Sequence, residues 1–165
     1  MDGRAMPVRL PRLAGRPVLV RIHPSLGPHL AAASISRRVI LLDSEVLTPP
    51  EFERTLVHEI FHFAWVRLSN AERWDWERTL AGELRQHAKG ELGWSAERRK
   101  KRLTSGEVRG RARPWRLYAC ESFCDTAAWR FASVPEHREF TLAARFRRLR
   151  RAWFQRHIET RTILI

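Results

Sequence analysis

The stretch EFERTLVHEIFHFAWVRL, residues 51–68, carries a well-marked helical pattern. Apolar residues recur at the spacing of one helix face, at Phe52, Leu56, Ile60, Phe63 and Val66. Just before this stretch, Thr48 and Glu51 match a T-x-x-E capping box, with two prolines in the first turn. We therefore expect a helix from about Pro49 to Leu68.

The middle of this helix holds a pattern typical of metal sites. Residues 58–62 read His-Glu-Ile-Phe-His, which matches H-E-x-x-H. On a helix, His58 and His62 lie one turn apart on one face, so both imidazoles can reach one metal ion. Glu59 lies beside that face, where it can take a proton from metal-bound water. A charged triplet among apolar residues is costly without such a partner. The alternative is two surface histidines with an ordinary glutamate between them.

A catalytic zinc needs a third protein ligand and an open position for water. The metzincin pattern requires glycine at position 65 and histidine at position 68, and this chain has Trp65 and Leu68. The best candidate is Glu121, in the segment ESFCD at 121–125. Asp125 lies four residues on, hence on the same face of an expected helix, where it would hydrogen-bond a metal-binding histidine.

Other ligand sets stay open at this point. His87 would give a three-histidine site, and Glu83 is a weaker option. Cys120 and Cys124 more often fill a core than bind zinc when they lie inside a helix. Glu121 and Asp125 could also face solvent or pair with arginines. Two histidines and a carboxylate suit Zn²⁺, although the same triad binds iron or manganese.

The HEIFH segment followed by ESFCD on a later helix resembles the gluzincins, the clan of thermolysin-like metallopeptidases. The segment ESFCDTAAWRFASVP also resembles part of the small bacterial zincins that cleave repressors. The resemblance implies His58, His62 and Glu121 as zinc ligands, Glu59 as general base and Asp125 as support for a ligand. It implies a sheet edge strand that binds extended substrate, for which residues 35–42 are the candidate. The long gap before Glu121 makes residues 70–114 an expected helical insertion.

Charge is the unusual feature of the composition. Lys and Arg number 31 against 18 Asp and Glu, for a formal charge of +13. Nine basic residues fall between Arg98 and Arg116, and the last helix adds more. They indicate either a solvated, arginine-rich surface or attraction to nucleic acid. We expect no membrane span and no secretory signal, and two cysteines four residues apart make a poor disulfide, so a cytoplasmic protein is expected.

The remaining pattern predicts one α+β domain over 1–165 in which helices dominate. Residues 1–16 read as an irregular tail. Strands are expected at 17–22 and 35–42, and they form a small N-terminal sheet. Helices are expected at 71–89, around 95–103, and at 115–132, with a basic loop at 104–114. A second T/S-x-x-E box at Ser133 and Glu136 predicts a last helix running to about His157.

These features lead to one principal functional hypothesis, a zincin-like zinc metallopeptidase acting on a peptide or protein substrate. The alternative is a basic nucleic-acid-associated protein with a structural or regulatory zinc site. The two merge in a protease that acts on DNA-bound proteins. A zincin fold that has lost its activity also agrees with the sequence.

Overall fold

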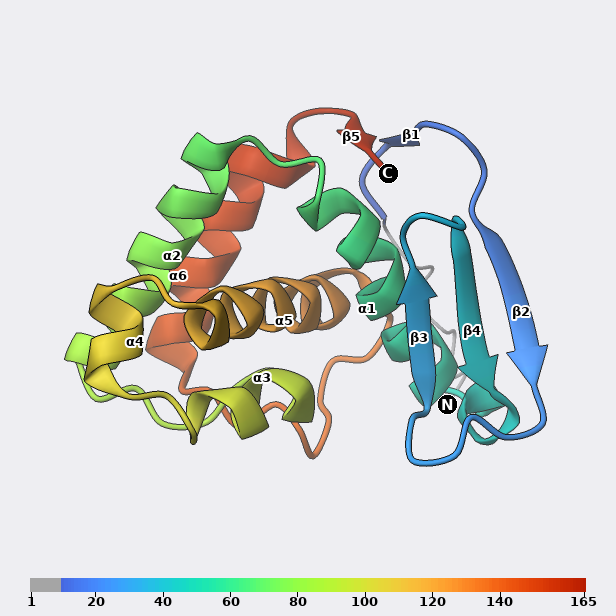
Figure 1. Cartoon of the computed structure of the whole chain (residues 1–165), viewed down its shortest axis with the longest axis horizontal. Coiled ribbons are helices and arrows are strands. Elements are labelled where there is room, and N and C mark those ends of the chain that lie inside the picture. The colour runs from blue at the N-terminus through green and yellow to red at the C-terminus, as the bar shows by residue number, and fades with distance from the viewer. Residues whose placement is uncertain (1–9) are drawn as a thin grey trace, which may run out of the picture.

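A small sheet stands against one side of a group of helices in the computed structural model, which describes residues 10–165 (Figure 1). The sheet has the order β2-β4-β3. Its strands are β2 (Leu19–His23), β3 (Ala31–Ser34) and β4 (Val39–Asp43). Strand β2 runs parallel to β4, and β3 runs antiparallel to β4. The expected α+β class with predominating helices is confirmed.

The first expected strand is confirmed as β2, and the second is shorter than expected. Residues 35–38 form the turn between β3 and β4, and Arg38 takes a positive φ of 54° there. Strand β4 lies in the centre of the sheet, so the expectation that residues 35–42 form an edge strand is wrong. The edge strand next to the helices is β3, which packs against α1 (Glu51–Trp65).

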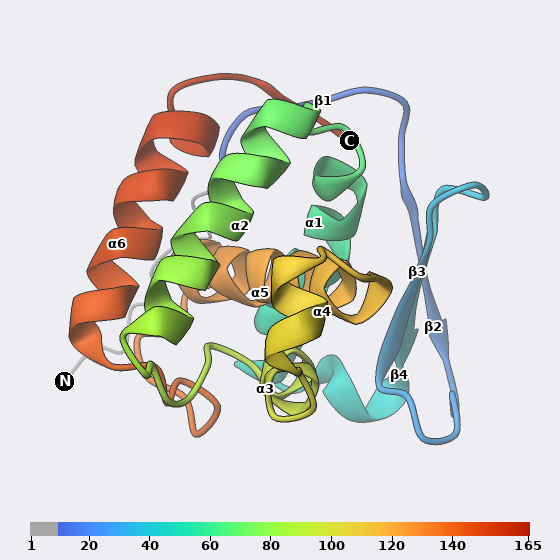
Figure 2. The same ribbon diagram turned by 60° about the vertical axis from the view of Figure 1, so that its left-hand side comes forward.

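Helix α5 (Arg113–Phe131) occupies the middle of the molecule and packs against α1, α2 (Asn70–Arg85), α3 (Trp94–Lys100) and α4 (Ser105–Arg109). Figures 1 and 2 both place α2 beside α6 (Ala144–Phe154), on the side of α5 away from the sheet. The core between these helices is aromatic, with Trp76, Phe123 and Trp153 fully buried. Helices α2 to α4 fill the range expected to be a helical insertion, and α3 packs on α5.

Helix boundaries follow tertiary contacts more than the capping patterns. Thr48 ends a 3₁₀ turn (Ser44–Leu47), and α1 begins after Pro50 without a side-chain cap, so the first expected box is wrong. The box at Ser133 is wrong as well, because α6 begins at Ala144. The residues between are irregular, and the amides of Thr141 and Leu142 donate to the Glu91 carbonyl.

Two capping boxes do form, at Ser69 with Glu72 and at Thr104 with Glu107. The second begins α4, so residues 104–114 are not the simple loop that was expected. A π-helical turn (Gln155–Glu159) follows α6, and β5 (Ile163–Leu164) pairs in parallel with β1 (Leu13–Ala14). Residues 10–16 of the expected tail therefore include a short strand, and residues 1–9 lie outside the described residues.

Candidate metal centre

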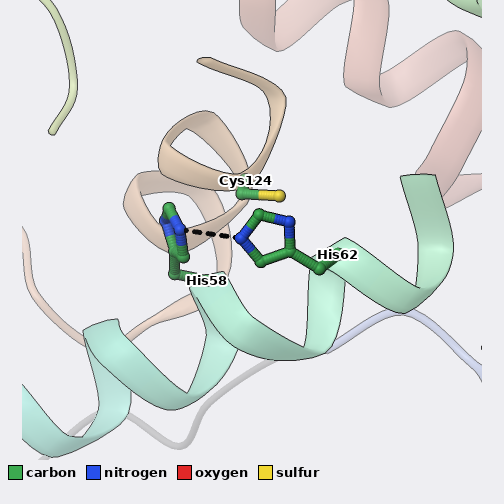
Figure 3. Close-up of side chains that lie close together, drawn as sticks. All are labelled: His58, His62 and Cys124. Carbon is green, nitrogen blue, oxygen red and sulfur yellow. Dashed lines mark hydrogen bonds between the residues drawn. The ribbon is translucent and has the colours of Figure 1, made fainter. Parts of the chain in front are cut away.

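Helix α1 presents two imidazoles to a cleft. One face of the helix is held in the core by Val57, Phe61 and Ala64, which turns His58 and His62 toward α5. Their Nε2 atoms face each other at 3.2 Å (Figure 3). Two nitrogen ligands of a tetrahedral zinc, each about 2.05 Å from the metal, lie about 3.3 Å apart. The spacing therefore fits a shared metal ion.

Glu121 on α5 supplies a carboxylate at a matching distance. Its Oε2 lies 3.4 Å from Nε2 of His58, and a nitrogen and an oxygen on one tetrahedral zinc are also about 3.4 Å apart. The Ser95 hydroxyl donates to the same oxygen, and Arg99 lies 3.5 Å from the other. Burial would raise the pKa of Glu121, but the hydrogen bond and charge of His58 outweigh it and lower that pKa to about 2. The group is thus an anion at neutral pH.

Asp125 holds His58 from the other side of the ring. Its Oδ1 lies 2.7 Å from Nδ1 of His58, and its Oδ2 accepts the Ala96 amide at 3.0 Å. Because Nδ1–H donates to the carboxylate, Nε2 is left as the metal-binding atom. Burial would lower the pKa of His58, but the Asp125 charge outweighs it and raises that pKa well above the usual value.

Gly93 has no Cβ and so leaves the space that the Asp125 carboxylate occupies. A Cβ at this position would come within 2.2 Å of the Asp125 Cγ and 2.3 Å of Oδ1. The φ of Gly93 is −175°, which any residue adopts, so the requirement is one of space.

The two cysteines lie beside the histidines rather than in a remote core. The sulfur of Cys120 is 3.6 Å from Nδ1 of His62, where it takes the position that Asp125 takes at His58. The ligand atoms of His58, His62 and Cys124 all lie within 4.8 Å of one another (Figure 3). The thiol of Cys120 has a pKa lowered to about 6 by its hydrogen bond with Cys124. Burial raises the pKa of Cys124 well above its usual value.

Glu121 and Cys124 thus compete for the third position. The compact group contains Cys124, whereas Glu121 contacts His58 and not His62 among its described contacts. We favour Glu121, because its lowered pKa makes it an anion at neutral pH and its Oε2 already lies 3.4 Å from Nε2 of His58. Cys124 is a fully buried thiol whose raised pKa opposes the thiolate that zinc requires.

Glu59 is nearly buried, with 7% of its surface exposed, and it lines the same cleft. Burial raises its pKa, which makes its carboxylate a stronger proton acceptor. The cleft has a volume of about 860 Å³. Its floor is α1 and α5, one wall is β3, and the other wall is α3.

The remaining candidates lie away from this centre. His87 is exposed at the end of α2 and is not among the residues that line the cleft. Glu83 is paired with the buried Arg150. The structure therefore brings together His58, Glu59, His62, Glu121 and Asp125, but not His87.

No helix between residues 10 and 165 has the length and apolar character that a membrane crossing requires. Comparisons with protein-family models, with curated proteins and with solved structures find no match to this chain.

Proposed function

We propose that this chain is a zinc-dependent metallopeptidase of the zincin type, with His58, His62 and Glu121 as metal ligands. The observation that carries the proposal is the pair of distances at Nε2 of His58, which lies 3.2 Å from Nε2 of His62 and 3.4 Å from Oε2 of Glu121. Each of these two distances fits a pair of ligands on one tetrahedral zinc. The three side chains line an open cleft with Glu59 beside them. That arrangement leaves room for a water molecule and a substrate.

Zinc held there would lower the pKa of a bound water and polarise a scissile carbonyl. The chain's own part is to supply and receive protons. Glu59 accepts a proton in its carboxylate form, which its raised pKa favours, and it then passes that proton to the leaving amine. Asp125 keeps the proton of His58 on Nδ1, and Ser95 and Arg99 orient Glu121.

Strand β3 is suited to hold a peptide. It pairs with β4 on one side only, so the backbone groups of its other edge are free of strand pairing within the described sheet. Residues Ala31 to Ala33 line the cleft, and their small side chains leave space above α1. An extended peptide added to this edge would pass the metal centre.

The test is Glu59→Gln. We expect the variant to retain one zinc per chain and to lose cleavage of a randomised peptide mixture, followed by mass spectrometry. His58→Ala should lose both the bound zinc and the cleavage activity. Wild-type activity in Glu59→Gln would remove Glu59 from the reaction and refute the proposed mechanism.

A second candidate function follows from Cys124. If its thiolate joins His58, His62 and Glu121, the metal has four protein ligands and no open position, as in structural zinc sites. The protein would then be a basic, nucleic-acid-associated module with a structural or regulatory zinc. Cobalt substitution separates the two, because a sulfur ligand gives thiolate-to-metal charge-transfer absorption that a His₂Glu site lacks. DNA affinity that falls steeply with salt, without peptidase activity, would also favour this candidate.

A further inference from the structure

Four arginines and four carboxylates line the cleft beside the metal centre, but two of the arginines have no carboxylate partner among the described residues. Each cleft carboxylate apart from Glu59 already has a partner. Glu139 accepts two hydrogen bonds from Arg54, Asp125 holds His58, and Glu121 contacts His58 and Arg99.

Two further guanidinium groups, those of Arg98 and Arg102, line the cleft and are exposed. Within residues 10–165, neither has an acidic partner or a hydrogen bond through its side chain. In most ion pairs of the described residues the cation, such as Arg111 or Arg130, contacts a carboxylate that lies away from the cleft. Arg98 and Arg102 are therefore available to a ligand.

The position of these arginines relative to the metal follows from helix geometry. Ser95, Arg98, Arg99 and Arg102 are spaced i, i+3, i+4 and i+7, so they share one face of α3 and the turn that follows it. Ser95 donates to Glu121. At about 1.5 Å of rise per residue, Arg98 and Arg102 lie roughly 5 and 10 Å along the axis from Ser95.

An extended peptide covers about 3.3 Å per residue. Three or four residues of an extended peptide therefore span the distance along α3 from Ser95, which contacts Glu121, to the two arginines. We propose that these two arginines make the cleft selective for peptides with aspartate or glutamate side chains close to the bond that is cut. The inference depends on the proposed function for the cleavage of the peptide, whereas the selective binding of the peptide does not depend on it.

Nucleic acid is the other polyanion that arginines bind. The cleft favours a peptide, because the arginines line it together with the small alanine side chains of β3, whose outer edge has no strand partner in the described sheet. Two other exposed arginines of the basic run, Arg109 and Arg113, do not line the cleft. They provide a matched control, because they carry the same charge on a different face.

The experiment measures binding without turnover. Zinc-loaded Glu59→Gln protein is titrated into a fluorescent octapeptide of alternating alanine and glutamate, and into its glutamine counterpart, with fluorescence anisotropy as the readout. We expect the acidic peptide to bind about tenfold tighter, as two partly exposed ion pairs provide. Adding Arg98→Glu and Arg102→Glu should remove that preference. Adding Arg109→Glu and Arg113→Glu should change it less than about twofold, because salt screens distant charges.

Several results would overturn the inference. These are equal binding of the two peptides, no binding of either, or the same loss in the control variant. Tighter binding of an oligothymidine strand, lost with Arg98 and Arg102, would assign the arginines to nucleic acid instead. Zinc content and circular dichroism of each variant establish that it is folded. If acidic peptides bind as expected but wild type cleaves none of them, the proposed reaction fails and the selectivity stands.

Discussion

Replacing Gly93 with alanine should weaken metal binding, although Gly93 touches no expected ligand. The added Cβ would lie 2.2 to 2.4 Å from the three carboxylate atoms of Asp125. An ordinary contact between such atoms is about 3.5 Å, so the carboxylate must move by roughly 1 Å. That shift would stretch the 2.7 Å contact to His58 and the 3.0 Å bond from Ala96 beyond hydrogen-bonding distance.

The size of the effect follows from what Asp125 does. Loss of a group that orients a metal-binding histidine typically lowers metal affinity about 10- to 100-fold, which is roughly 1.4 to 2.8 kcal/mol of binding free energy. Zinc affinity is measured by competition with a chromophoric chelator at constant pH. Urea unfolding of the metal-free protein gives the accompanying cost in the free energy of unfolding.

Gly106→Ala is the matched control. A Cβ at Gly106 would meet nothing closer than 4.0 Å, and the residue lies inside α4, where alanine is favoured over glycine. This variant should bind zinc as wild type does. Zinc affinity of Gly93→Ala within twofold of wild type would refute the role given to Asp125.

Three further predictions concern single side chains. Asp125→Asn should lower the pKa of His58 in the metal-free protein, because the charge that raises it is gone; an NMR pH titration of the imidazole checks this, and an unchanged pKa would contradict it. The pKa of Glu121 is about 2 against an ordinary 4.5, so its carboxylate stabilises the metal-free fold above pH 4.5 and loses this effect as pH falls toward 2. Urea unfolding across this pH range should show this contribution, of at most about 3 kcal/mol, in the wild type and not in Glu121→Gln. Identical pH profiles of the two proteins would contradict this prediction. Arg150→Ala should cost about 3–5 kcal/mol of the free energy of unfolding, because it leaves Glu83 buried without its cation and leaves buried Glu91 with Lys100 alone. Exposed Arg148→Ala should cost less than about 0.5 kcal/mol, and equal costs would refute the argument.

The features that could be predicted from the sequence are those that depend on local periodicity. The i, i+4 spacing of His58 and His62, and of Glu121 and Asp125, fixes which side chains share a helix face. Both pairs lie on helices in the structure, and the two faces meet. The sequence favours Glu121 over His87 but leaves His87 open, because the choice depends on how α5 packs against α1.

Features set by distant contacts were missed. Strand β3 consists of three alanines and a serine, which have little β propensity, and pairing with β4 makes it a strand. The box at Ser133 failed because the following segment bonds to the Glu91 loop instead of continuing as a helix. The sequence predicts that Cys120 fills the core, but its sulfur lies beside His62. Cys124 has the burial expected of a core residue, and its place among possible ligands is visible only in three dimensions.

The most direct test of the central claim is elemental analysis of zinc bound to the purified protein. Wild type, His58→Ala, Glu121→Ala, Cys124→Ala and His87→Ala would be compared at equal chelator concentration. We predict one zinc per wild-type chain, its loss in His58→Ala and Glu121→Ala, and its retention in the other two. Zinc retained in Glu121→Ala but lost in Cys124→Ala would contradict the His₂Glu centre, and a folded wild-type protein that binds no metal would contradict the metallopeptidase altogether.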